Sequence, residues 1–189
     1  MTPTTASSTA APAPTSAHHA DPTAAAAVGA LRQCAEFIAR LPRAAYTSPS
    51  AAVAGSTIGQ HVRHALDHFA AAASAIDGAV IAYDHRERDT PIEHDPAAAL
   101  AKMTALEKAV AQVDAAAGAA PVRIRVMLSG AGDEATLSST LARELAFATH
   151  HAIHHHAMIA TIAREQGLEP PQGFGRAPST LHHEAPATR

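Results

Sequence analysis

The sequence predicts a mainly α-helical protein, and three observations lead to this fold class. Alanine is extremely abundant, aromatic residues make up only 3% of the chain, and the hydrophobic 47% consists mostly of small side chains. Small side chains suit closely packed helices better than sheets. Apolar residues also recur at helical spacing, and residues typical of helix ends delimit four long segments. We therefore expect an all-α protein, a four-helix bundle around one core.

The chain of 189 residues has room for one domain. Residues 1–20 are rich in Pro, Thr, Ser and Ala and are expected to form a disordered tail. Residues 21–170 are expected to form the bundle. Residues 171–189 are rich in Pro and Gly and are expected to form an irregular C-terminal tail.

The first two helices are predicted from their boundary residues. The first begins with Asp21 as N-cap and Pro22 in the first helical position, and it stops at Pro42. The second begins after Ser56 or Thr57 and fades at Gly78. A loop rich in Ser, Pro and Gly joins them.

The remaining predicted elements are two helices and, between them, a segment in which the spacing of apolar residues changes from helical to alternating. The third helix is expected from Asp95 to Gly118, and the fourth from Ser138 or Ser139 to Gly167. Between them, "PVRIRVML" alternates apolar and other residues, which indicates a strand. With "SGAGDE" as a turn and "ATLS" as the return strand, a small β-hairpin is expected at about 121–138. An extended loop is the alternative.

Charge and cysteine content exclude several classes of protein. Fourteen basic and seventeen acidic residues give a formal charge of -3, and the basic residues are scattered, which argues against a nucleic-acid partner. No apolar run is long enough to span a membrane, and the first twenty residues lack a secretory signal. The single Cys34 is expected to be a small buried residue in a reducing compartment. We therefore expect a cytoplasmic protein.

The segment "THHAIHHHAMIA", residues 149–160, places five histidines in seven consecutive positions. At about 100° per residue, His151 and His155 lie in the apolar stripe of the fourth helix. His150 and His154 lie toward its edge, and His156 is expected to point to solvent on the other flank. An i, i+4 pair of imidazoles can bind one ion, so His151 and His155 are candidate metal ligands.

A third ligand is expected from the second helix, where "QHVRHALDHF" places three histidines along one side. Periodicity ranks His61 or His68 ahead of His64, but it does not settle the choice. Glu144 also points inward, either as an acid/base or supporting carboxylate or as the partner of an arginine. The remaining histidines lie in tails or charged loops and are expected to be solvated; they are His18, His19, His85, His94, His182 and His183.

These motifs resemble those of the DinB-like (DinB/YfiT-like) family of metal-binding four-helix bundles. Its members carry a histidine in a second-helix motif like "sIxxxlxHlxDh" and an HxxxH pair in the last long helix. "TIGQHVRHALDH" places His64 on the first of these positions, and "HAIHHHAMI" places His151 and His155 on the pair. The resemblance therefore implies His64, His151 and His155 as metal ligands, with His61 and His68 as second choices. His156 stands where members often have arginine or tyrosine.

The resemblance also implies a function. It implies a divalent ion, zinc or nickel, with water in its open positions, and a metal-dependent enzyme such as a thiol-dependent transferase or a hydrolase-like protein. A small-molecule substrate, such as a low-molecular-weight thiol, and a homodimer are expected. The alternatives are a non-catalytic or stress-associated bundle in which the ion is structural, and a histidine-rich metal store that binds several ions.

Overall fold

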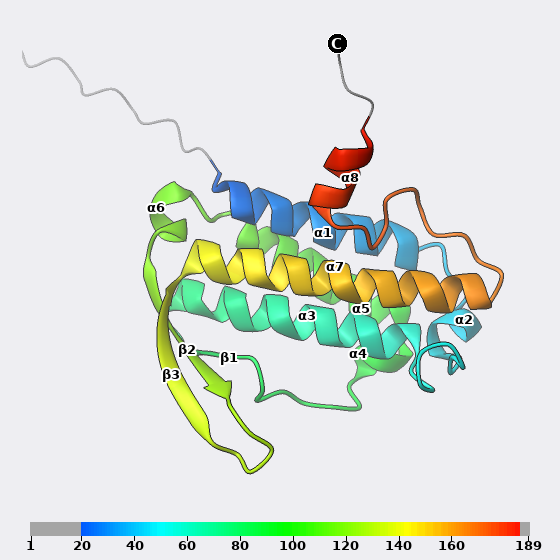
Figure 1. The fold of residues 1–189 in the computed structure, drawn as a ribbon, viewed down its shortest axis with the longest axis horizontal. Coiled ribbons are helices and arrows are strands. Elements are labelled where there is room, and N and C mark those ends of the chain that lie inside the picture. Colours follow the sequence, from blue (N-terminus) through cyan, green and yellow to red (C-terminus); the bar gives the residue numbers. More distant parts are fainter. Residues whose placement is uncertain (1–19, 186–189) are drawn as a thin grey trace, which may run out of the picture.

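The structure is a computed structural model and describes residues 20–185; the predicted N-terminal tail, with His18 and His19, lies almost entirely outside that range. Four long helices form a bundle with a small sheet at one end (Figure 1). The long helices are α1 (Pro22–Ile38), α3 (Ile58–Ser74), α5 (Pro96–Val110) and α7 (Leu141–Glu165). Short helices are α2 (Arg43–Thr47), α4 (Pro91–His94), α6 (Ala115–Gly118), α8 (Pro178–Glu184) and the 3-10 turn η1 (Ala75–Asp77). The predicted mainly helical bundle is confirmed.

Three predicted helix starts are confirmed. The Asp21 carboxylate accepts hydrogen bonds from the backbone of Thr23 and Ala24, which places Pro22 at the first helical position. Thr57 caps α3 in a reciprocal pair with Gln60, because each side chain accepts from the other's backbone N–H at 3.1 Å. The Asp95 carboxylate caps α5 by accepting a hydrogen bond from the backbone N–H of Ala97.

Two predicted helix boundaries differ from the observed ones. The helix expected to reach Gly118 is two helices, because α5 ends at Val110 and the Asp114 carboxylate caps the separate α6. The fourth helix begins after Thr140, not after Ser138 or Ser139, because those two serines continue a strand. At the start of the fourth helix, strand pairing decided against the two serines as caps, because both pair with β2.

The predicted hairpin is confirmed and is part of a three-stranded sheet. β2 (Pro121–Met127) pairs antiparallel with β3 (Glu134–Thr140) over the whole length of both strands. β1 (Ile81–Ala82) was not predicted and pairs parallel with β2, so that Ile81 lies opposite Ile124. This pairing fixes the chain just after α3, and Tyr83 follows directly from it.

The core lies between the four long helices, and α7 packs against both α1 and α3. In Figure 1, α3 and α7 run side by side along the molecule. Cys34 lies in this core, and burial raises the pKa of its thiol to about 12, which agrees with its predicted role as a small buried residue. None of the helices in residues 20–185 combines the length and apolarity needed to cross a membrane.

Candidate metal centre

Five histidines meet where α3 and α7 lie side by side, and we call them the histidine cluster. They are His61, His64 and His68 from α3 and His151 and His155 from α7. The ring centroid of His64 lies 4.9 Å from that of His151 and 4.5 Å from that of His155. The rings of His68 and His151 stack with centroids 3.8 Å apart. Histidines that face one another from two helices are the arrangement from which metal sites in bundles are built.

Three members of the cluster offer nitrogen atoms to one point. One nitrogen from each of His64, His68 and His151 lies within 4.8 Å of the other two. The Nε2 atom of His151 is buried and has no hydrogen-bond partner among the described residues. A buried polar atom without a partner costs free energy, and coordination of an ion would satisfy it. The donor set and this unpartnered atom fit a divalent metal ion.

A backbone contact fixes the tautomer of His68. Its Nδ1 atom lies 3.0 Å from the carbonyl oxygen of His64. A carbonyl only accepts, so Nδ1 must donate, and Nε2 of the neutral ring keeps its lone pair. Histidine ligands are typically oriented in this way, with the second ring nitrogen donating to a fixed acceptor.

Two of the three predicted ligands belong to the group of converging nitrogen atoms. His64 and His151 belong to the converging group, and the second choice His68 completes it. His155 is buried, and its ring contacts those of His64 and His151. Its Nδ1 atom lies 2.9 Å from Nδ1 of His61, the other second choice. The assignment of His155 as a ligand stays a prediction.

The cluster holds its imidazoles in the neutral form. Burial, and then nearby positive groups that include Arg86, lower the pKa of His64 to about 3. Burial and the neighbouring His68 lower the pKa of His151 to about 4, and burial and His64 lower that of His155 to about 2. Neutral imidazole is the form that binds a metal ion, so the cluster carries lone pairs ready for one at pH 7.

His156 corrects the sequence analysis. It was expected to be solvated, but only 2% of its surface is exposed. Its ring stacks on Phe174 with centroids 4.8 Å apart and an interplanar angle of 11°. The segment after α7 turns back and covers this flank of the helix, and burial lowers the pKa of His156 to about 4.

The other histidines within the described range behave as predicted. His150 and His154 are exposed on α7. Those in the charged connections and near the C-terminus are exposed as well; they are His85, His94, His182 and His183.

Glu144 lies on the inner side of α7, and its side chain is completely buried. The Tyr83 hydroxyl donates to it at 2.7 Å, the Ser139 hydroxyl at 2.6 Å and the Arg143 guanidinium at 2.8 Å. Burial opposes ionisation of Glu144, but these hydrogen bonds and the Arg143 charge outweigh it and hold its pKa below the ordinary value. The predicted inward position and pairing with an arginine are confirmed.

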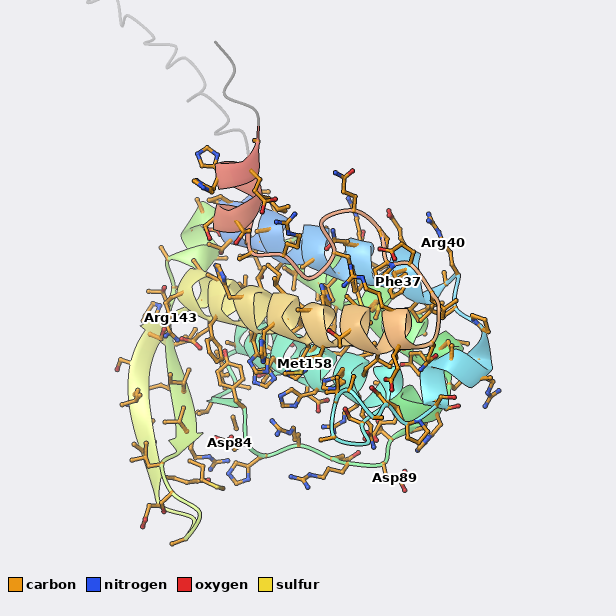
Figure 2. All side chains as sticks on the ribbon, turned by 45° about the vertical axis from the view of Figure 1, so that its right-hand side comes forward. Phe37, Arg40, Asp84, Asp89, Arg143 and Met158 are labelled. Carbon is orange, nitrogen blue, oxygen red and sulfur yellow. The ribbon has the colours of Figure 1, made fainter. Side chains whose placement is uncertain are left out.

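Sequence reasoning missed Tyr83 and Arg86, which lie between β1 and α4. The Tyr83 ring stacks on His68 with centroids 5.2 Å apart, so it joins Glu144 to the cluster. Figure 2 labels Asp84 and Asp89 on the segment that leads from Tyr83 through Arg86 toward α4. A sequence signal existed, because Val80, Ile81 and Tyr83 form a short run of β-branched and aromatic residues after Gly78, which is typical of a strand.

A cavity of about 410 Å³ lies between α3 and this segment. Asp67 and Ala70 of α3 line it on one side, and Tyr83 and Arg86 line it on the other. Tyr83 therefore contacts the cavity as well as the histidine cluster.

Together, the fold and the site define a helical bundle in which two neighbouring helices bring neutral histidines into a candidate metal centre. Residues 22–180 match the DinB family, and the chain belongs to that family. It is also 34% identical over 105 residues to FK506-binding protein 5 of Rhizopus delemar. The aligned part is 55% of this chain and 27% of that relative, so the chain spans about a quarter of the relative's length. No solved structure matches the chain.

Proposed function

We propose that the chain binds one divalent metal ion, zinc or nickel, between α3 and α7. The observation that carries this proposal is the convergence of His64, His68 and His151, with the buried Nε2 of His151 left without a partner. Membership of the DinB family supports the same site. Three imidazole ligands leave positions open, as in catalytic rather than structural zinc sites.

The third ligand has two candidates, each supported by a different observation. The family motif favours His155, whose ring centroid lies 4.7 Å from that of His151. The converging nitrogen atoms favour His68. We propose the set of His64, His151 and His155, and the variants below distinguish it from the set that includes His68.

We further propose that the protein is a metal-dependent enzyme, a thiol-dependent transferase or a hydrolase-like protein. A divalent ion lowers the pKa of a bound water or thiol, which is the chemistry it would supply here. The cavity beside Tyr83 and Arg86 offers room for a small-molecule substrate such as a low-molecular-weight thiol. Arg86 would hold an anionic group of that substrate, because this residue lines the cavity and its charge acts on the cluster.

A structural ion is the second candidate function. This function is favoured because the candidate ligands come from two different helices, α3 and α7. An ion bound by both would cross-link helices that pack against each other in the bundle. Thermal unfolding with and without the ion separates the two functions. A structural ion should carry much of the stability, whereas removal of a catalytic ion should leave the bundle folded.

The test of the site is metal content and affinity in protein purified without an affinity tag. We expect one ion per chain, and we expect affinity to fall at least about 100-fold in His64→Ala and in His151→Ala. Of His68→Ala and His155→Ala, the variant with the larger loss identifies the third ligand. His150→Ala is the matched control, because His150 is exposed on the same helix. Full occupancy in His151→Ala would exclude the proposed site, and several ions per chain would favour a metal store.

A further inference from the structure

We propose that Ser56 and His61 form a hydrogen-bonded relay that fixes the tautomer of His155 and keeps the lone pair on its Nε2, the atom through which it could bind a metal ion. This makes His61 a positioning residue rather than a ligand. The role of the relay in metal binding rests on the proposed function. The relay itself consists of hydrogen bonds within the chain.

The relay begins at the loop before α3. The Ser56 hydroxyl lies 2.6 Å from the carbonyl oxygen of Val53, which only accepts, so the hydroxyl hydrogen of Ser56 is donated there. The Ser56 oxygen also lies 2.9 Å from Nε2 of His61. Since the serine has no second hydrogen, it accepts in this contact, and Nε2 of His61 must donate.

The tautomer of His61 then determines that of His155. A neutral imidazole that carries its hydrogen on Nε2 has a lone pair on Nδ1. Nδ1 of His61 lies 2.9 Å from Nδ1 of His155, a distance that requires a hydrogen between two nitrogen atoms. That hydrogen belongs to His155, so Nε2 of His155 has the lone pair that a metal ligand needs.

The relay does for His155 what the backbone does for His68. The Nδ1 hydrogen of His68 goes to a carbonyl of its own helix, which no side-chain substitution removes. The Nδ1 hydrogen of His155 goes instead to the side chain of His61 on the opposite helix. Substitution of Ser56 or His61 should therefore change the orientation of His155 without altering the proposed ligands His64, His151 and His155 themselves.

The competing explanation of the short contact is a second metal site. Two imidazole nitrogens 2.9 Å apart would also suit one ion that binds His61 and His155 together. The two explanations differ in the number of ions per chain and in the position of the hydrogen on His155.

The direct test uses the full-length, metal-free protein labelled with nitrogen-15 in histidine. Two-bond proton–nitrogen correlation spectra at neutral pH distinguish the two tautomers, and His61→Ala and His155→Ala assign the signals. We expect the hydrogen of His155 on Nδ1 and that of His61 on Nε2. Ser56→Ala removes the acceptor that fixes His61, so both residues should shift toward mixed tautomers. A hydrogen on Nε2 of His155 in the unsubstituted protein would overturn the relay.

The second test is zinc affinity, measured by competition with a chelator. Loss of such a supporting contact typically weakens metal binding about 10- to 100-fold, and we expect this in His61→Ala. His61→Asn keeps an acceptor oxygen near the place of Nδ1 and should recover most of the loss. His154→Ala is the control, because His154 is exposed beside His155. Unchanged affinity in His61→Ala, or a second ion that this variant loses, would contradict the relay.

These measurements separate the relay from the proposed function. If the unsubstituted protein binds no divalent ion, the proposed function fails, while the metal-free spectra still show whether the relay exists. If His61→Ala fails to fold, Ser56→Ala still tests the relay, because it removes only the acceptor that fixes the tautomer of His61.

Discussion

His155 and His156 are neighbours on α7 and both are buried, with 8% and 2% of their surfaces exposed, yet they lie on different flanks of the helix. His155 faces α3, where other imidazoles and a relay surround it. His156 faces the segment after α7, where Phe174 covers it. Each flank has a buried ring nitrogen without a hydrogen-bond partner in the described part of the chain, Nε2 of His151 on the first and Nδ1 of His156 on the second. On the first flank imidazoles from two helices converge, whereas on the second an aromatic ring covers the histidine. Burial of a histidine alone therefore does not indicate a metal ligand.

The largest expected effect lies on the Phe174 flank. A Cβ atom on Gly175 would lie 2.4 Å from the backbone nitrogen of Ala157, and the glycine has a φ of +73°. Gly175→Ala should lower the free energy of unfolding by about 3 kcal/mol in urea titrations, since backbone atoms must move. Gly167→Ala is the control, because its φ of +75° is similar and nothing lies within 4 Å. It should lose only about 1 kcal/mol. Equal losses would mean that the segment does not pack as described.

Acid should reveal the burial of His156. Its pKa is about 4 in the folded protein against an ordinary value of 6.5, so the folded state binds fewer protons than the unfolded state. Its contribution to stability is complete above pH 6.5 and falls as the pH drops toward 4, by about 3 kcal/mol in all. His156→Leu should flatten the pH dependence of the free energy of unfolding by this amount in metal-free protein. An unchanged slope would contradict the buried position.

The third test concerns the hydrogen bonds of the buried Glu144 near the start of α7. Glu144 is linked to the histidine cluster through Tyr83, whose ring stacks on His68. Glu144→Gln replaces an acceptor oxygen by an amide that faces a hydrogen-bond donor, and should cost about 2 kcal/mol in urea titrations. Tyr83→Phe removes one of the three donors and should cost about 1 kcal/mol. No loss in either variant would contradict the hydrogen-bonded network.

The smallest expected effect has the opposite sign. Because Nε2 of His151 is buried without a partner, His151→Leu should stabilise the metal-free protein by about 1 kcal/mol while it abolishes ion binding. His154→Leu on the exposed side should change the stability of the metal-free protein by less than about 0.5 kcal/mol. A loss of stability in His151→Leu would show that this nitrogen already has a partner.

The sequence predicted the helices well because caps and apolar spacing are local signals. Thr57 and the inward position of His155 could both be identified from neighbouring residues. The burial of His156 could not, because the residue that covers it lies in a segment without helical periodicity. Helical periodicity could not choose among His61, His64 and His68, because all three face α7. The choice of His64 came from the family motif and stays a prediction.

The relay joins residues 94 positions apart, and every version of the candidate site takes donors from both α3 and α7. A chain that emerges from the ribosome carries the three histidines of α3 long before their counterparts exist. Contacts between residues so far apart in the sequence form late in folding, after the local helices have formed. Ion capture would therefore mark the completion of folding, and the visible absorption of bound cobalt could time the docking of α7 in a refolding experiment.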